Sequence, residues 1–569
     1  MTSSEIEPVD FNKNALLAWA QSNSRNTNWP VVYTLNDQNE IYVGETTNAE
    51  MRMRQHLASP SKKHLTHVNV IFDASFNKSV CLDLESHLIK YFHADGKFTV
   101  LNGNGGITDA DYFEREKYRK NFEEVFSRLV ESGQLTRTIP ELINSDVFKY
   151  SPFKALTSDQ TIAVEDILET LFDSEISEPI VIQGDPGTGK TIIAVYLIKL
   201  LRDIARADAD EALEQDSLFA DFFQSGYREQ AKDMRIGLVI PQKSLRETLR
   251  RVFKRTPGLS ESMVIEPFEL GDIDDLFDLL IVDEAHRLQQ RANQPAAERN
   301  TKYKKINEKL FGQDDTKFTQ LDWVIARSSR QILLLDAAQS VKPADLPEKT
   351  VSGLLERAYK SGLLLRLTSQ MRVNGGQDYI DYVSKLFDGK KPEQPKTFGT
   401  YDLRFFESFV ELRRTLSEKE HEVGLARLLA GYAWPWISKG KNGASHDFEI
   451  EGQKLKWNST DRDWINSKGS VDEVGSIHTI QGYDLNYAGV IIGPELGYDS
   501  INRKVTFRRE HYHDKKGKEN NPTLGIKYSD ADLLAYVKSI YRVLLTRGIQ
   551  GTFVYVVDPE LRAYLRNFF

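Results

Sequence analysis

The sequence predicts an α/β fold with parallel sheets, divided among several domains. Its 569 residues exceed what one hydrophobic core usually holds, so roughly three or four domains are expected. From about residue 151, short apolar runs alternate with helical stretches, as in parallel sheets that helices cover on both faces. Enough runs are present for two sheets, and they lie at 179–183, 236–240, 279–282, 331–335, 488–492 and 552–557.

Composition narrows the class of protein. The formal net charge is −9, which argues against an all-over basic surface but still allows local nucleic-acid contacts. Cys81 is the single cysteine, which excludes an intrachain disulfide and a cysteine-based zinc site and fits a cytoplasmic protein. No apolar run is long enough for a membrane span, and the first residues lack the features of a secretory signal.

The region before residue 151 predicts a smaller module. Two short strands at 30–35 and 40–45 flank a polar turn, and helices follow at 49–57 and 80–92. The acidic stretch at about 205–233 is expected to be an insertion. The predicted domains are 28–106 for the small module, 107–150 for a helical connector, 151–360 for a first parallel-sheet lobe, and 361–569 for a second lobe with an insertion around 440–470.

A phosphate-binding loop stands between an apolar strand and an apolar helix, which is the context that the motif G-x-x-x-x-G-K-T requires. Its glycines let backbone N–H groups surround phosphates, and the helix N-terminus adds positive potential. Lys190 is expected to contact the outer phosphates and Thr191 to bind Mg²⁺. The loop consists of Gly184, Asp185, Pro186, Gly187, Thr188, Gly189, Lys190 and Thr191.

Two acidic residues end the apolar strand at 277–282. Asp283 is expected to hold Mg²⁺ through water, and Glu284 to polarise the water that attacks the γ-phosphate. Gln339 follows a further buried strand and is a candidate γ-phosphate sensor. The sequence therefore predicts ATP hydrolysis.

These motifs occur in order with others, and residues 151–569 together resemble a superfamily 1 helicase core, in particular the family related to the Schlafen helicase domain. Gln160 ends a segment that resembles the adenine-reading Q motif. The resemblance implies two RecA-like lobes with ATP between them, and Arg372 and Arg547 as arginine fingers from the second lobe. The other matching segments are 241–245 (motif Ia, nucleic-acid backbone), 370–372 (motif IV), 477–482 (motif V), 541–547 (motif VI), 431–436 and 490–494.

Two basic clusters are candidate phosphate tracks, with an ordinary solvated surface as the alternative for each. One follows motif Ia on a predicted helix, and the other lies late in the second lobe. Their members are Arg246, Arg250, Arg251, Lys254 and Arg255 in the first, and Arg503, Lys504, Arg508 and Arg509 in the second.

Residues 28–106 resemble the GIY-YIG nuclease family. Tyr33 and Tyr42 lie on the two predicted strands, Arg52 lies on the next helix, and Glu85 lies on a later one. The resemblance implies that a tyrosine orients or deprotonates water, that Arg52 holds the phosphate, and that Glu85 binds Mg²⁺ or Mn²⁺. The resemblance implies that Asn102 steadies the metal site and that His56 assists, with a packing or backbone-contact histidine as the alternative for His56. Alternatively, the tyrosines are core residues, or the module binds DNA without cutting it.

The expected protein is an ATP-dependent nucleic-acid helicase or translocase with a fused metal-dependent endonuclease. DNA is the expected partner, with a role in phage defence, restriction or repair by analogy. The alternative is a nucleotide-gated switch that binds DNA or RNA without processive unwinding. The sequence is compatible with an oligomer or with a partner protein.

Overall fold

The computed structural model describes residues 4–103, 111–173, 178–207, 219–291, 297–336, 344–371, 373–389, 392, 394–438, 446–460, 464–480, 483–514, 518 and 527–569. The chain forms two compact units. One comprises Met1–Ser174, Thr191–Met234 and Thr248–Met263, and the other comprises Glu175–Lys190, Arg235–Glu247 and Val264–Phe569. Within the described residues, every helix is too short or too polar to span a lipid bilayer.

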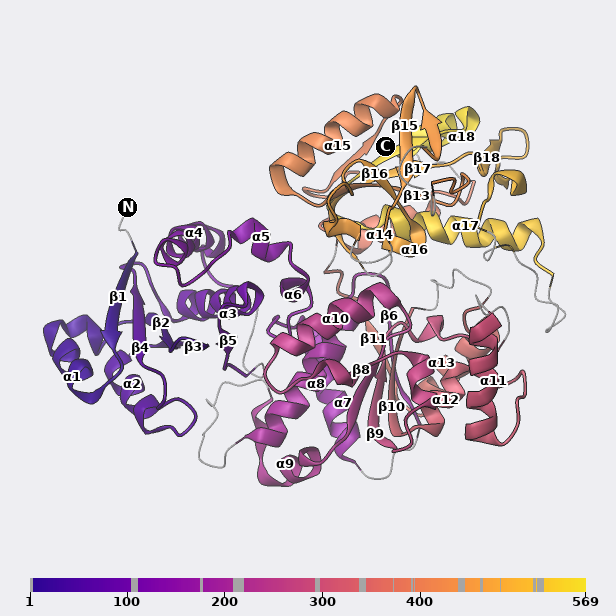
Figure 1. Ribbon diagram of the computed structural model, residues 1–569. Coiled ribbons are helices and arrows are strands. Elements are labelled where there is room, and N and C mark those ends of the chain that lie inside the picture. Colours follow the sequence, from indigo (N-terminus) through magenta and orange to yellow (C-terminus); the bar gives the residue numbers. More distant parts are fainter. Residues whose placement is uncertain are drawn as a thin grey trace. The chain divides into compact units, whose positions relative to one another are not determined.

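The N-terminal module is built on a five-stranded sheet in the order β1-β4-β2-β3-β5 (Figure 1). β2 and β3 form the predicted antiparallel hairpin. β1 lies before the predicted start at residue 28, and it pairs with β4 along its whole length. The strands are β1 (Glu5–Asp10), β2 (Val31–Asn36), β3 (Glu40–Thr46), β4 (His67–Phe72) and β5 (Thr99–Val100).

Helices cover this sheet on both faces and continue into the connector. α3 packs one face with Val80, Leu84 and Leu88 in a core that also receives α4 residues. A second core holds Tyr33 and Met53 of the other face. The helices are α1 (Lys13–Ser22), α2 (Ala49–Ala58), α3 (Lys78–Asp95), α4 (Arg115–Glu131), α5 (Ile139–Ile143) and α6 (Asp146–Lys149).

Further helices follow the connector. Two of them have residues in both compact units: α8 begins at the phosphate-binding loop, and α10 follows the predicted motif Ia. The predicted insertion at 205–233 contains a short helix among its described residues. These helices are α7 (Ser158–Phe172), α8 (Lys190–Arg206), α9 (Ser225–Lys232) and α10 (Lys243–Arg255).

The first lobe has a six-stranded sheet, β11-β6-β10-β9-β7-β8, in which every neighbouring pair is parallel. This arrangement confirms the predicted α/β class. Three further helices belong to the lobe: α11 (Ala297–Phe311), α12 (Gln320–Ala326) and α13 (Glu348–Lys360). The strands are β6 (Ile180–Gly184), β7 (Ile236–Val239), β8 (Val264–Ile265), β9 (Phe277–Val282), β10 (Ser328–Leu335) and β11 (Leu364–Leu367).

The second lobe has a seven-stranded sheet, β12-β20-β17-β13-β16-β15-β14 (Figure 1). The segment predicted as an insertion around 440–470 supplies its last two strands, because β15 pairs in parallel with β16 and β14 pairs with β15. The strands are β12 (Asp402–Phe405), β13 (Ala426–Ala430), β14 (Phe448–Ile450), β15 (Gln453–Trp457), β16 (Glu473–Ser476), β17 (Leu485–Ile492) and β20 (Gly548–Val556).

A separate two-stranded hairpin, β18 (Leu496–Asp499) and β19 (Lys504–Phe507), belongs to the same lobe. Apolar residues from both faces of the large sheet form two cores. The helices of the lobe are α14 (Gly376–Lys385), α15 (Phe409–Val423), α16 (Ile477–Ile480), α17 (Asp530–Leu545) and α18 (Pro559–Leu565).

Candidate active sites

The phosphate-binding loop leaves the carboxyl end of β6, a central strand of the first lobe. Gly187 and Gly189 have φ angles of 93° and 79°, which L-residues with side chains rarely adopt. The Lys190 ammonium is buried and donates to the carbonyl oxygens of Gly184 at 2.5 Å and Asp185 at 3.0 Å. This backbone has the conformation of a phosphate cradle, so the residues present fit a bound nucleotide triphosphate.

Asp283 and Glu284 lie at the carboxyl end of β9, on the same edge of the parallel sheet as the loop. Asp283 is fully buried. Glu284 has a left-handed φ of 52°, and its carboxylate lies 2.9 Å from Arg287 Nε. Burial would raise the pKa of Glu284, but Arg287, His286 and Lys190 lower it well below its ordinary value. The carboxylate is therefore ionised, as polarisation of water requires.

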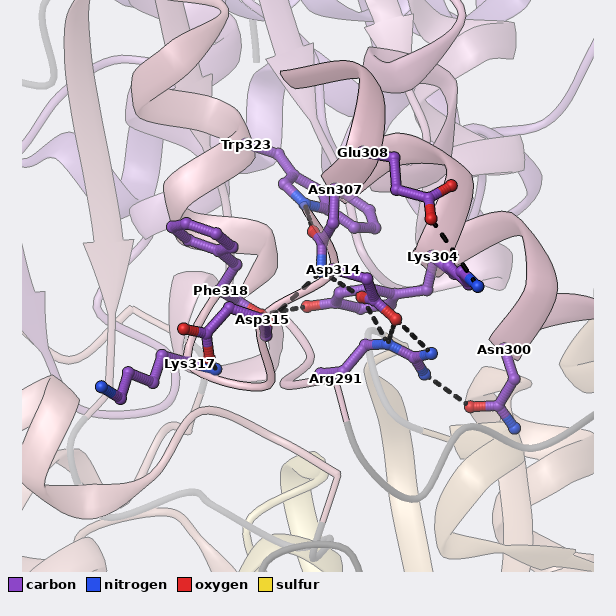
Figure 2. Close-up of polar contacts among 11 residues, drawn as sticks. Arg291, Asn300, Lys304, Asn307, Glu308, Asp314, Asp315, Lys317, Phe318 and Trp323 are labelled. Atoms are coloured by element: carbon purple, nitrogen blue, oxygen red, sulfur yellow. Dashed lines mark hydrogen bonds and ion pairs between the residues drawn. The ribbon is translucent and has the colours of Figure 1, made fainter. Parts of the chain in front are cut away.

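A polar network holds the chain that follows Glu284 (Figure 2). Arg291 makes two-pronged contacts of 2.9 Å to the Asp314 carboxylate, through Nε to Oδ1 and through Nη2 to Oδ2. Asn307 Nδ2 donates to Asp314 Oδ1 at 2.9 Å, and Asn307 Oδ1 accepts from the indole of Trp323 at 2.7 Å. The network joins this segment to α11 and α12, and nothing in the sequence had indicated it.

Four further residues were predicted for the nucleotide site, and the structure describes two of them, Gln160 and Arg547. Gln160 is buried, and its Oε1 accepts from the Thr157 amide at 3.1 Å, which caps the start of α7. Arg547 is buried in the second lobe, where it donates to the Tyr483 carbonyl at 3.3 Å. Gln339 and Arg372 lie outside the described residues.

The first predicted phosphate track is partly engaged within the protein. Arg246 is buried and donates to the Ile240 carbonyl at 2.7 Å. Arg251 forms an ion pair with Asp146 of α6 at 2.5 Å. The five cations of α10 therefore do not form one continuous free face, and the two that are fixed position the helix instead.

The nuclease-like site is centred on a contact between Tyr33 and His56. Tyr33 is fully buried, and its Oη lies 2.8 Å from Nε2 of His56 on α2. Gly44 of β3 faces this ring, and a β-carbon at Gly44 would overlap the Tyr33 hydroxyl. The glycine is therefore required for the hydroxyl to reach the histidine.

The other predicted residues interact electrostatically with Tyr33. Burial is the largest cause that raises the pKa of Tyr33 well above its usual value, and Tyr42 adds to it. The Arg52 guanidinium acts in the opposite direction, and the Glu85 charge raises the pKa further. Tyr33, Tyr42 and Arg52, from β2, β3 and α2, thus lie close to one another, and the charge of Glu85 on α3 acts on Tyr33.

His56 stays neutral in this site. Burial lowers its pKa to about 3, with further contributions from the positive charges of Lys62 and Arg52. The Lys62 ammonium lies 4.2 Å from the centre of the Tyr42 ring. A neutral imidazole can accept a hydrogen bond from the phenol beside it, whereas a protonated one could not.

The contacts of two residues near this site were not predicted, although Asn102 itself was expected to steady the metal site. Asn102 holds β3 in place: its Oδ1 accepts from the Val43 amide at 3.0 Å, and its Nδ2 donates to the Val43 carbonyl at 2.8 Å. Glu45 is buried and forms an ion pair with Lys78 at the start of α3. A pattern of alternating residues predicts a strand but not the partner of a buried carboxylate.

The residues of this site fit a divalent cation held through one carboxylate. Glu85 is half-buried on α3 and interacts electrostatically with Tyr33. Mg²⁺ is commonly bound by one or two carboxylates, with water and substrate phosphate as its other ligands. Among the described residues, the only group of three ligand side chains is Asp37, Glu40 and His64, which surrounds the β2–β3 turn far along the hairpin from the Tyr33 hydroxyl.

Comparison with known families gives one match for each of the two predicted parts of the chain. Residues 177–558 match the family described as Schlafen group 3, DNA/RNA helicase domain. Residues 30–98 match the GIY-YIG catalytic domain. The first match covers more than half of the chain, and together the two bear out the fused architecture that the motifs predict.

Individual relatives are more distant. An uncharacterized protein of Saccharomyces cerevisiae, YPL245W, is 27% identical over 418 residues, which cover 68% of this chain and 83% of that protein. Arterivirus nonstructural protein 10 (helicase) has a TM-score of 0.27 and 12% identity, over 71% of this chain and 64% of its own. The Pif1 helicase from Candida albicans has a TM-score of 0.26 and 12% identity, over 72% and 97%.

Proposed function

Because the chain belongs to the Schlafen group 3 DNA/RNA helicase domain family and carries a GIY-YIG catalytic domain, we propose that it is an ATP-dependent nucleic-acid translocase or helicase with a fused metal-dependent endonuclease. DNA is the proposed substrate. The observation that supports the proposal is the presence of two clusters of candidate catalytic residues in one chain, one around Lys190 and Glu284 and the other around Tyr33 and His56.

The motor half of the proposal is supported by the first lobe. Lys190 and the positive-φ glycines form a phosphate cradle, and the ionised Glu284 lies on the same edge of the sheet. Mg²⁺, held by Thr191 and through water by Asp283, would neutralise charge on the phosphates. Glu284 would orient the attacking water, while Arg372, Arg547 and Gln339 would complete the site from other segments.

The nuclease half is supported by the Tyr33–His56 pair. Neutral His56 would accept a hydrogen bond from the Tyr33 hydroxyl and so orient Tyr33 toward the attacking water. Arg52 would bind the phosphate oxygens, and a Mg²⁺ or Mn²⁺ ion on Glu85 would stabilise the charge that develops in the transition state. Tyr42 would line the same pocket and set the position of Lys62.

The motor is tested by steady-state ATP hydrolysis with and without single-stranded DNA or RNA at fixed salt. Salt must be held constant because backbone contacts weaken steeply as ionic strength rises. We expect stimulation in the wild type, its loss in Lys190→Ala, and no change in Lys349→Ala, an exposed residue of α13. A wild-type protein that no nucleic acid stimulates would refute the motor.

The nuclease is tested on defined DNA and RNA substrates with Mg²⁺ or Mn²⁺, each with and without ATP. Cleavage is expected to disappear in Glu85→Ala and to persist in Glu131→Ala, an exposed carboxylate at the end of α4. Cleavage that survives Glu85→Ala would remove Glu85 from the mechanism. Lys190→Ala then shows whether cleavage depends on the motor.

A second candidate is a nucleotide-gated switch that binds DNA or RNA without unwinding. It is favoured by contacts within the first compact unit. His93 of α3, the helix that carries Glu85, contacts Thr256 at the end of α10 at 3.1 Å. Because motif Ia (241–245) leads into α10, such a link would let motif Ia control the nuclease. ATP-dependent cleavage without strand displacement would support the switch, and processive displacement would exclude it.

A further inference from the structure

The β2–β3 hairpin carries two carboxylates at its turn, on the face that holds the nuclease-like site. Tyr33 pairs with Gly44 on that face, and Tyr42 and Glu40 occupy the alternate positions of β3 toward the turn. Side chains at every second residue of a strand lie on one face of the sheet. Across the turn, the Asp37 amide donates to the Glu40 carbonyl at 3.1 Å. The row that begins at Tyr33 and Gly44 therefore ends at Asp37 and Glu40.

The α2–β4 loop, residues 59–66, reaches the hairpin at two points along this row. The Lys62 ammonium lies 4.2 Å from the centre of the Tyr42 ring. Two residues later, Nε2 of His64 lies 2.7 Å from Oε2 of Glu40. The same loop therefore contacts both the nuclease-like site and the acidic turn.

Asp37, Glu40 and His64 bring three metal-binding side chains together at the turn. One ligand atom from each lies within 4.8 Å of the other two. The Asp37 carboxylate uses Oδ1 to accept from the amides of Asn39 and Glu40, both at 2.7 Å. Among the described residues, no hydrogen bond reaches Asp37 Oδ2. Two separate segments of the chain thus supply an imidazole nitrogen and carboxylate oxygens to one place.

The simplest alternative is an ordinary surface ion pair between His64 and Glu40, which would contribute little to stability. That pair accounts neither for Oδ2 of Asp37 nor for the closeness of two carboxylates, which repel each other when no cation lies between them. His64 offsets one of the two negative charges when it is protonated and neither when it is neutral. A divalent cation among the three side chains would offset both.

Of the divalent cations, Zn²⁺ suits this set of ligands. It binds imidazole nitrogen and carboxylate oxygen at about 2.0–2.2 Å, and an open zinc site has three protein ligands and a water. Mg²⁺ instead takes oxygen ligands in octahedral geometry. Tetrahedral zinc ligands lie about 3.4 Å apart, so the three side chains need to approach by about 1 Å from their spacing of up to 4.8 Å. His64 is exposed and can rotate to make this movement.

We propose that Asp37, Glu40 and His64 form a zinc site, with water as the fourth ligand, that ties the α2–β4 loop to the β2–β3 turn. The site is separate from Glu85, to which the proposed nuclease assigns its Mg²⁺ or Mn²⁺. Zinc binding at the turn does not depend on the proposed nuclease. Because Lys62 lies two residues before His64, bound zinc would also hold the Lys62 ammonium beside the nuclease-like site.

The first test is calorimetric titration of the metal-free full chain with Zn²⁺, in excess Mg²⁺ to suppress weak binding by other carboxylates. The wild type should bind one Zn²⁺ that His64→Ala and Glu40→Gln bind at least about 100-fold more weakly, because losing a group that only supports a ligand already costs about 10–100-fold. His67→Ala, at an exposed position three residues after His64, should bind Zn²⁺ as the wild type does. Equal affinity in the wild type and His64→Ala overturns the site.

The second test follows the loop itself with trypsin, which cuts after lysine and can reach the exposed Lys63. Zn²⁺ should slow cleavage at Lys63 about tenfold in the wild type and in His67→Ala, since cleavage depends on the population of opened loop. It should leave cleavage of His64→Ala unchanged. Equal cleavage with and without Zn²⁺, in a wild type that binds it, overturns the tie between loop and turn. A chain that binds Zn²⁺ through His64 but cuts no nucleic acid refutes the nuclease and supports the zinc site.

Discussion

Asp146 Oδ2 and Arg251 Nη2 lie 2.5 Å apart and join the connector to the helix that follows motif Ia. Asp146 is 8% exposed, and it also accepts from Thr248 Oγ1 at 3.2 Å. Thr256, the residue directly after α10, contacts His93 of α3 at 3.1 Å. The N-terminal module and this part of α10 therefore belong to one compact unit.

The Asp146–Arg251 pair is predicted to stabilise the first unit by about 1 kcal/mol, because one partner is buried while the other is partly in water. Asp146→Ala should cost about 1–3 kcal/mol, since Thr248 and Arg251 both lose an acceptor. A double-mutant cycle with Arg251→Ala, followed by chemical unfolding, measures the coupling. Lys254→Ala on the same helix is the control, and a coupling near zero would contradict the link.

Gly44 is predicted to be essential for cleavage although it carries no side chain. In Gly44→Ala the new methyl group must displace the Tyr33 hydroxyl from His56. A shift of about 1 Å in a reacting group can cost about 100-fold in rate, so cleavage should fall by that order. ATP hydrolysis should not change.

Gly226→Ala provides the comparison for Gly44→Ala, because a β-carbon there meets nothing within 4 Å. Both variants are assayed for cleavage and for unfolding temperature. Full cleavage by Gly44→Ala would mean that the Tyr33–His56 contact has no part in the reaction.

The sheets could be predicted from the sequence because buried parallel strands are nearly continuous apolar runs. The run at 488–492, for example, is the fully buried end of β17. β1 could not be recognised in this way, because Glu5–Asp10 is polar and acidic and gains its place only by pairing with β4. For the same reason β14 and β15, in a polar segment, were interpreted as an insertion.

The site was predictable to the extent that residue types in a known spacing indicate chemistry. Tyr33, Arg52 and Glu85 were identified from spacing, and in the structure the charges of Arg52 and Glu85 act on Tyr33. The hydrogen bond from Tyr33 to His56 and the Asn102 clamp on Val43 depend on tertiary contacts between distant segments. Arg246 and Arg251 were predicted to be free to contact phosphates, but the structure binds Arg246 to a backbone carbonyl and Arg251 to the Asp146 carboxylate. The sequence gives the charge of an arginine but not its partner in the fold.

Asn307 is predicted to be a critical residue of the polar network around Asp314 (Figure 2). It is fully buried, and Asn307→Ala leaves the Trp323 indole without its acceptor and Asp314 without one donor. Loss of buried hydrogen bonds and packing should lower the free energy of unfolding by about 2–4 kcal/mol.

Asn300→Ala is the control for this network. Asn300 is only half-buried and accepts a single bond of 3.0 Å from Arg291 Nη1, so its loss should cost under about 1 kcal/mol. Chemical unfolding of both variants, with ATP hydrolysis measured in parallel, tests the difference. Equal costs would show that the network does not depend on Asn307.

Glu495 is predicted to make the stability of the second lobe depend on pH. Burial raises its pKa to about 7, although the hydrogen bond from Tyr541 at 2.5 Å acts against this shift. The ordinary value is 4.5, so between pH 4.5 and 7 the folded protein holds more protons than the unfolded chain. The contribution of Glu495 to stability is therefore present below pH 4.5 and is lost as pH rises to about 7.

Glu495→Gln removes this titration while keeping an oxygen that can accept from Tyr541. Relative to wild type, the variant should gain stability as pH rises from 4.5 to 7, by up to about 1.4 kcal/mol per pH unit, with no further relative change above that range. Thermal unfolding across pH 4.5–8 measures the difference. Glu560→Gln, at an exposed position of α18, should follow the wild type throughout. If the stability of Glu495→Gln instead follows that of the wild type at every pH, the Glu495 carboxyl is ionised in the folded lobe. Charges other than the Tyr541 hydrogen bond must then offset the cost of burying it.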